Sequence, residues 1–172
     1  MNSQIKIVDE FLSEEDFIKV VSKYKNKDAT KWELQSSSFK PDELQFLKCD
    51  LSDDKFYNTY LYKKVVNQLH QGHYELSRVY LNGQWNGREG DFHKDGCYYT
   101  ALIYMSPYRY GNGGFTEIMT EPEPTLIHPI PNRLVIFSGN IHHKAYSFAY
   151  QTDPLRVTLA FKINVDHNEG WI

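Results

Sequence analysis

The spacing of hydrophobic residues along the chain changes near residue 73. Before this point apolar residues recur every three or four positions, and from residue 74 onward they recur at every second position. The first spacing is typical of amphipathic helices and the second of half-buried strands. The pattern therefore predicts an N-terminal region of helices followed by a region of strands.

The first predicted helix lies in the segment LSEEDFIKVVSKY. Ser13 is suited to be its N-cap, and the three acidic residues after it suit the positive end of the helix dipole. The apolar stripe of this helix consists of Phe17, Val20, Val21 and Tyr24. A second helix is predicted over residues 52–72, opened by Ser52, Asp53 and Asp54 and closed by Gly72, with the stripe Tyr57, Leu61, Val65 and Leu69. Between them, residues 29–49 predict a short strand at most.

The region after residue 73 contains six β-branched and aromatic runs separated by turn residues. The runs cover 74–82, 98–105, 114–119, 133–137, 143–150 and 155–165, and a turn is predicted at 152–154. Six strands after two helices predict a mainly β sandwich or jelly-roll barrel with the helices packed on one sheet. We expect a single domain over 1–172, with helical support in 1–72 and the jelly-roll core in 73–166.

The last strand predicts a different chemistry for each of its two faces. Alternation places Val157, Leu159, Phe161 and Ile163 on one face, which we expect to pack under the helices. The opposite face carries Arg156, Thr158, Ala160 and Lys162. If this second face lines the barrel, Arg156 and Lys162 are enclosed cations and need an anion.

Composition limits the class of protein, its expected location and its expected partners. The chain has 172 residues, 41% of them hydrophobic and 15% aromatic, which suits a soluble globular protein. Neither a signal peptide nor a membrane-spanning run is apparent, and the two cysteines form no Cys-x-x-Cys pair, so a cytoplasmic location is expected, in a host cell if a phage encodes the chain. A net charge of −3 favours a partner other than nucleic acid; a groove lined by Arg78, Arg88 and Arg109 is the alternative.

The segment GDFHKDG places His93 and Asp95 two positions apart, so on an extended chain both side chains point the same way. Such a pair is usually part of a solvated loop, and a metal site needs a further ligand. The remaining histidines are His70, His73, His128, His142, His143 and His167. The pair His142 and His143 opens a late strand after a Gly-Asn turn. Two histidines and one carboxylate on one face of an octahedron suit non-haem Fe(II).

The ordered set RVYLNGQ, GDFHKDG, TALIYMS, GGFTEI, RLVIFSGNIHHKA and RVTLAFKI resembles the 2-oxoglutarate/Fe(II)-dependent dioxygenases, in particular their prolyl 4-hydroxylase-like branch. The likeness covers about residues 76–164. It implies a double-stranded β-helix and a reaction that uses Fe(II), 2-oxoglutarate and O₂, with ascorbate as an accessory reductant. An aliphatic C–H is hydroxylated, and succinate and CO₂ are the co-products.

The resemblance also implies roles for individual residues. His93, Asp95 and His143 would be the iron ligands, with His142 as the alternative to His143. The residues implied to hold 2-oxoglutarate are Arg156, Tyr104, Thr158 and Tyr80. A guanidinium suits a carboxylate because it offers two parallel N–H donors. The loop between Tyr80 and His93 is longer than in animal relatives, which weakens the assignment of Tyr80.

The branch implies a prolyl residue in a peptide or protein as substrate. Candidate rim residues are Trp85, Arg88, Tyr108, Arg109 and Tyr110, which serve equally well as anchors of long loops. One alternative is the same chemistry on a small metabolite or a nucleobase. An alternative of another class is a non-catalytic, cupin-like metal- or sugar-binding module, although cupins usually carry His-x-His where this chain has His-x-Asp.

Overall fold

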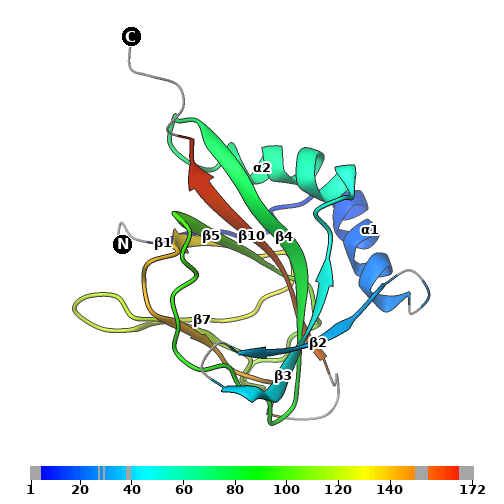
Figure 1. The fold of residues 1–172 in the computed structure, drawn as a ribbon, viewed down its shortest axis with the longest axis vertical. Helices are drawn as coiled ribbons and strands as arrows, with labels where there is room; N and C mark the ends of the chain where they lie inside the picture. Colours follow the sequence, from blue (N-terminus) through cyan, green and yellow to red (C-terminus); the bar gives the residue numbers. More distant parts are fainter. Residues whose placement is uncertain (1–4, 27, 29, 38–39, 150–154, 167–172) are drawn as a thin grey trace.

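The computed structural model describes residues 5–26, 28, 30–37, 40–149 and 155–166, which form two antiparallel sheets (Figure 1). The larger sheet has the strand order β1-β8-β5-β10-β4-β3-β2, and the smaller has the order β7-β6-β9. The strands are β1 (Ile5–Val8), β2 (Glu33–Ser37), β3 (Lys40–Asp50), β4 (Tyr74–Trp85), β5 (Tyr99–Tyr104), β6 (Thr116–Ile118), β7 (Thr125–Ile127), β8 (Leu134–Ser138), β9 (His143–Ala145) and β10 (Leu155–Val165). The predicted turn at 152–154 and His167 lie outside the described residues.

The first predicted helix is confirmed as α1 (Glu14–Lys25). The Oγ atom of Ser13 accepts a hydrogen bond from the backbone N–H of Asp16 at 3.2 Å, so Ser13 is the N-cap. Val20 is fully buried, and Phe17, Val21 and Tyr24 pack against the same core. The three- and four-residue spacing therefore identified the buried face.

The second predicted helix is shorter than its apolar stripe suggested. It consists of a π-helix, η1 (Phe56–Leu61), followed by α2 (Tyr62–Val66). The start is late because the Asp54 carboxylate accepts a hydrogen bond from the backbone N–H of Phe56 at 3.0 Å, which closes a turn before the helix. The predicted stripe is nevertheless buried in the core, fully at Tyr57, Leu61 and Val65 and partly at Leu69.

Residues 1–72 contribute strands as well as helices, which the prediction of a helical support region missed. Strand β1 pairs with β8, and β3 pairs with β4, so this region and the jelly-roll core share the larger sheet. The short strand predicted within residues 29–49 is in fact the hairpin β2–β3. Strand β7 was missed too, because its three residues lie between two Pro-rich turns.

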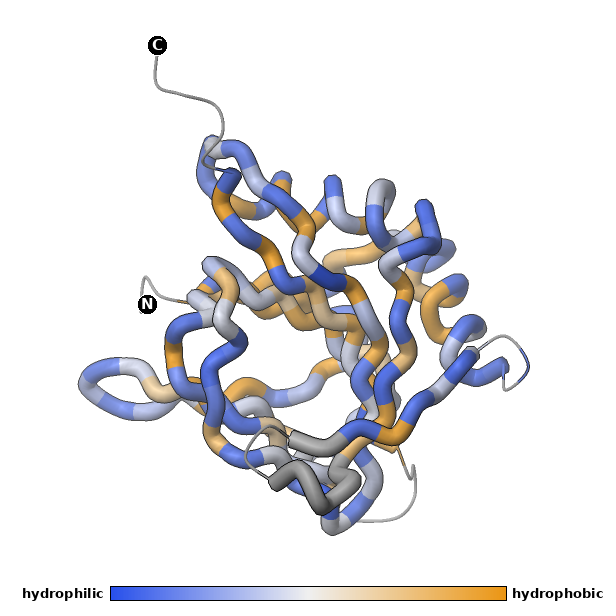
Figure 2. The backbone as a smooth tube through the Cα atoms, viewed as in Figure 1, coloured by the Kyte–Doolittle hydropathy of each residue, from blue (hydrophilic) through white to orange (hydrophobic). Residues whose placement is uncertain are grey.

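The outer face of β10 packs under the helices as predicted. Val157, Leu159, Phe161 and Ile163 belong to one hydrophobic cluster together with Val20, Leu61 and Val65 of the helices. Figure 1 shows α1 and α2 on the side of the larger sheet that lies away from β7, and in Figure 2 the orange hydrophobic segments gather where helices and sheet meet. None of the helices in the described ranges is long and apolar enough to cross a bilayer.

The inner face of the larger sheet turns towards the smaller sheet. A second hydrophobic cluster joins the two, with Val135 and Phe137 from the larger sheet and Ile118 and Ile127 from the smaller. This arrangement is the predicted jelly roll. The inward side chains of β10, from Arg156 to Lys162, are each at most 3% exposed, so both ends of this strand carry a buried cation.

Candidate metal centre

The segment that carries His93 and Asp95 is fixed by backbone hydrogen bonds to the start of β9. His93 and His143 exchange two N–H···O=C bonds of 3.0 Å each, and the N–H of Asp95 donates to the carbonyl of Gly139 at 2.8 Å. Gly139 is required here, because a Cβ at this position would lie 2.4 Å from the carbonyl oxygen of Cys97. Two segments fifty residues apart in the sequence are thus held side by side.

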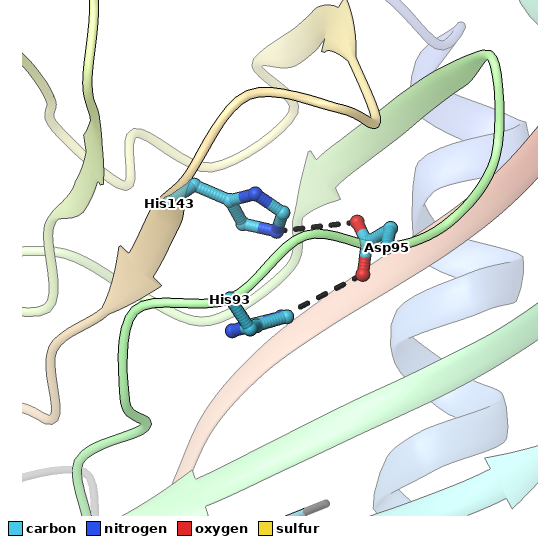
Figure 3. Close-up of side chains that lie close together, drawn as sticks. All are labelled: His93, Asp95 and His143. Atoms are coloured by element: carbon cyan, nitrogen blue, oxygen red, sulfur yellow. Dashed lines mark ion pairs between the residues drawn. The ribbon is translucent and has the colours of Figure 1, made fainter. Parts of the chain in front are cut away.

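The side chains of His93, Asp95 and His143 converge on one point (Figure 3). One ligand atom from each lies within 4.8 Å of the others. The Nε2 atom of His143 is 3.1 Å from Asp95 Oδ2, and that of His93 is 3.6 Å from Oδ1. The cluster thus contains His143 and not His142, whose side chain is exposed.

Both imidazole rings are oriented by backbone carbonyl groups. The Nδ1 atom of His93 lies 2.8 Å from the carbonyl oxygen of Asp91, and that of His143 lies 2.9 Å from the carbonyl oxygen of Ile141. A carbonyl oxygen only accepts, so Nδ1 is the protonated nitrogen in each ring. Each Nε2 atom faces the carboxylate, so the neutral form of each ring offers its free lone pair there, which is the arrangement of metal-binding histidines.

Asp95 is kept ionised in a nearly buried position. Its Oδ2 atom accepts a 2.5 Å hydrogen bond from the Thr100 hydroxyl and forms an ion pair with the Lys162 ammonium. Burial alone would raise the pKa of the Asp95 carboxyl, but its contacts with His143 and His93 and the charge of Lys162 hold it well below its usual range. The cluster therefore offers two imidazole nitrogens and one anion to a cation.

Arg156 lies on the same inner face of β10 and is 2% exposed. Its guanidinium donates to the Gly114 carbonyl at 2.7 Å, to Gln84 Oε1 at 3.1 Å and to Thr116 Oγ1 at 2.9 Å. The positive φ of Gly114, 73°, turns that carbonyl towards the guanidinium. No ion pair joins Arg156 to a carboxylate within the described ranges, and burial lowers its pKa. The charge of Arg156 therefore lacks an anionic partner from the described protein.

The other residues expected at a co-substrate site lie between the two cations. The Tyr104 ring is 5.4 Å from Cζ of Arg156, and its hydroxyl donates to Thr116 at 2.7 Å. Thr158 is buried beside it, opposite Tyr104 in the β10–β5 register. Tyr80 is half-buried on β4, where its ring centroid is 6.0 Å from Lys162 Nζ. Their role towards a ligand stays a prediction.

Three polar contacts of this interior were missed at the sequence level. Gln84 and Thr116 bind Arg156, and Thr100 binds Asp95. Gln84 continues the inward alternation of Tyr80 and Asn82 on β4, so the period of two could have identified it. No sequence signal marks Thr116, because it lies on the smaller sheet, whose short strands leave the register of inward positions undefined.

The predicted rim residues are placed less uniformly. Tyr108 donates to, or accepts from, the Nδ1 atom of His128 at 2.7 Å, and the Tyr110 ring, 89% exposed, stacks on His128 with centroids 5.4 Å apart. Trp85 is half-buried at the end of β4. The arginines of the suggested basic groove, Arg78, Arg88 and Arg109, are each exposed and so do not line a buried groove.

No family model and no curated protein matches the sequence, whereas many solved structures match the fold. A prolyl hydroxylase from Trichoplax adhaerens, in complex with a peptide of the hypoxia inducible factor oxygen degradation domain, superposes with a TM-score of 0.77 at 14% identity, over 94% of this chain and 84% of that one. The chain has the fold of the 2-oxoglutarate/Fe(II) oxygenases.

Two further structures show the same fold. HygX from Streptomyces hygroscopicus, with nickel and 2-oxoglutarate bound, has a TM-score of 0.74 at 10% identity, over 99% of this chain and 86% of that one. A prolyl 4-hydroxylase from Pseudomonas putida has a TM-score of 0.65 at 13% identity, over 95% and 94%. These likenesses confirm the fold expected from the sequence motifs.

Proposed function

We propose that this protein is an Fe(II)- and 2-oxoglutarate-dependent dioxygenase that hydroxylates an aliphatic C–H bond. One observation carries the proposal: the Nε2 lone pairs of His93 and His143 and the Asp95 carboxylate meet at 3.1–3.6 Å. Electron pairs this close repel each other unless a proton or a metal cation lies between them. A divalent metal bound by two histidines and one carboxylate satisfies all three groups and suits Fe(II).

Arg156 supports the part of the proposal that concerns 2-oxoglutarate. A buried guanidinium without a carboxylate partner is costly, and a carboxylate ligand offsets that cost through paired N–H···O bonds. We assign Arg156 to the distal carboxylate of 2-oxoglutarate, with Tyr104 and Thr158 beside it and Tyr80 nearer Lys162. The bound metal would let O₂ oxidise 2-oxoglutarate to succinate and CO₂, with one oxygen atom going to succinate and the other to the substrate C–H, and the protein would orient the substrate and exclude water.

A prolyl residue in a peptide or protein is the proposed substrate. The Trichoplax prolyl hydroxylase of the same fold holds a peptide. A small metabolite is the second candidate, because HygX, also of this fold, is seen with hygromycin B. The rim residues Trp85, Arg88, Tyr108 and Arg109 are the proposed substrate contacts in either case.

The test is an anaerobic titration of the metal-free protein with Fe(II) and then 2-oxoglutarate, followed by the weak visible metal-to-ligand charge-transfer band. The adjacent histidines provide a matched pair of variants. We expect the band in the wild type and in His142→Ala, and its loss in His143→Ala. Iron binding without a band would refute the co-substrate assignment and favour a cupin-like module. Absence of iron binding would refute the metal site.

Substrate identity is tested separately, with aerobic turnover and ascorbate present. Prolyl peptides and small amines or sugars are supplied in parallel, and succinate formation is compared with the mass of the product. We expect succinate to rise with a prolyl peptide, which gains one oxygen atom. Coupled turnover with a small molecule only would replace the prolyl assignment and leave the reaction class intact.

A further inference from the structure

Lys162 is a fully buried ammonium group that the proposed reaction leaves without a role. It lies on the inner face of β10, 3% exposed, and Asp95 is its carboxylate partner. The Thr100 hydroxyl lies 3.4 Å from its Nζ atom and donates to the same carboxylate oxygen. A lysine buried this deeply is costly unless its charge is paired and hydrogen-bonded. Asp95 and Thr100 meet that requirement here.

The two oxygens of Asp95 are in different environments. Oδ2 accepts from both Lys162 and Thr100, and His143 Nε2 lies 3.1 Å from it. In the described part of the chain no hydrogen bond reaches Oδ1, and His93 Nε2 at 3.6 Å is too far to make one. A carboxylate oxygen has about two lone-pair sites, and the two donors engage those of Oδ2. Oδ1 is therefore the oxygen left for a cation.

We propose that Lys162, together with Thr100, is a positioning residue that restricts Asp95 to binding the metal through Oδ1 alone. The inference rests on the proposed function, because it concerns the metal assigned there. Lys162 contacts neither substrate nor co-substrate in this role. It acts through the carboxylate that it holds.

The restriction has a consequence for the number of open coordination positions. Two imidazoles and one carboxylate oxygen leave three positions of an octahedron, enough for the two donor atoms of a 2-oxo acid and one molecule of O₂. A carboxylate that bound through both oxygens would occupy one of the three. Lys162 and Thr100 thus keep the position for O₂ open when 2-oxoglutarate is bound.

The test uses nitric oxide as an O₂ surrogate, titrated anaerobically into the Fe(II)-loaded protein and followed by electron paramagnetic resonance. The variants are Lys162→Met, which keeps the chain length without the charge, and Thr100→Val, which keeps the shape without the hydroxyl. With 2-oxoglutarate present we expect nitric oxide to bind about 10- to 100-fold more weakly than to the wild type. Without 2-oxoglutarate its affinity should be unchanged, because positions remain open.

Three comparisons make the outcome decisive. Thr100→Ser should restore wild-type nitric oxide binding, since the hydroxyl is kept. Lys64→Met, which breaks the ion pair of the half-exposed Lys64 with the buried Asp16 at 3.3 Å, should change nothing. If Lys162→Met does not fold, the Thr100→Val and Thr100→Ser pair carries the test alone.

Two results overturn the inference while leaving the proposed function standing. One is wild-type nitric oxide affinity in the variants with 2-oxoglutarate bound. The other is loss of Fe(II) binding itself. That result would mean that Lys162 and Thr100 hold Asp95 in place for metal binding and do not restrict it to one oxygen. If the wild type binds no Fe(II), the proposed function fails first.

Discussion

Strand β10 carries two buried cations on one face, and their surroundings differ. Lys162 is paired with the Asp95 carboxylate, whereas Arg156 is bonded to a carbonyl, an amide and a hydroxyl, all neutral. Burial is nearly equal, 3% and 2% exposed. A buried charge needs an opposite charge nearby. Lys162 has one in Asp95, whereas no carboxylate among the described residues pairs with Arg156. In the proposed function, the same face of one strand would thus combine a support for a metal ligand with a receptor for a carboxylate.

The largest expected effect comes from removing Lys162, the buried cation that already has a carboxylate partner. In metal-free protein, Lys162→Met leaves the Asp95 carboxylate buried without its cation, and we expect the free energy of unfolding to fall by about 3–5 kcal/mol. Arg156→Met removes a charge that had no counter-ion, so its loss should be clearly smaller. Urea unfolding of both variants beside the wild type measures the difference. Equal losses would show that the two cations do not differ in the way the contacts indicate.

The next largest effect is expected from removing Arg156, the proposed partner of the 2-oxoglutarate carboxylate. Arg156→Met should weaken 2-oxoglutarate binding by about 3–4 kcal/mol, or roughly 100- to 1000-fold, since two charge-assisted hydrogen bonds are lost. Fe(II) affinity should stay at the wild-type value, because Arg156 makes no contact with the three proposed ligands. Calorimetric titration of the metal-loaded protein gives both constants. Arg156→Lys should retain part of the affinity as a point charge without the fork geometry. A variant that binds 2-oxoglutarate as the wild type does would contradict the assignment.

The two cations show which features of the site could be predicted from the sequence and which could not. Alternation along the last strand placed Arg156 and Lys162 on one inward face, and the i, i+2 spacing placed His93 and Asp95 together. Which cation already had an anion was beyond such local rules, because Asp95 reaches Lys162 only through folding. His142 and His143 were likewise left open, since the turn at Gly139 breaks the strand count. The structure brings His143 and not His142 into the cluster with His93 and Asp95, and its role as a ligand stays a prediction.

The strands that sequence patterns resolved poorly, β2 and β7, lack a local apolar pattern. Strand β2 reads Glu-Leu-Gln-Ser-Ser and carries few apolar side chains, so its place in the sheet comes from backbone pairing with β3. Strand β7 has three residues, too few to show a period. In contrast, α1 combined a cap, an acidic first turn and a stripe, and each of these signals held. Local signals that agree with one another predicted well, and long-range pairing did not follow from them.

A smaller effect on 2-oxoglutarate binding is expected from removing the Tyr104 hydroxyl. Tyr104→Phe removes one hydroxyl that donates to Thr116 and lies beside the Arg156 guanidinium. One hydrogen bond is worth about 0.5–1.5 kcal/mol, so we expect 2-oxoglutarate to bind up to about tenfold more weakly. The same calorimetric titration measures it. A loss as large as that of Arg156→Met would mean that Tyr104 contributes as much to 2-oxoglutarate binding as Arg156 does.

The smallest effect concerns a third cation, Arg133, which is paired outside the barrel. Its guanidinium donates to both carboxylate oxygens of Asp9, at 2.6 and 2.9 Å, but the Asp9 side chain is 54% exposed. The hydrogen bond from Arg133 outweighs the effect of burial and lowers the pKa of Asp9. Solvent screening limits such a pair, so Asp9→Asn should cost no more than about 0.5–1 kcal/mol at neutral pH.

The sign of the pH dependence follows from the lowered pKa. Asp9 contributes its stability above the unfolded-state pKa of about 4 and loses it as the pH falls through the lower folded-state value. The stability difference between wild type and Asp9→Asn should therefore vanish in acid, and urea midpoints measured from pH 7 downwards would show it. A difference that persists at low pH would mean that packing, and not charge, joins Asp9 to Arg133. The geometry of this exposed pair is as good as that of the Asp95–Lys162 pair. If its contribution is nevertheless several-fold smaller, burial and not geometry is what makes the cations of β10 decisive.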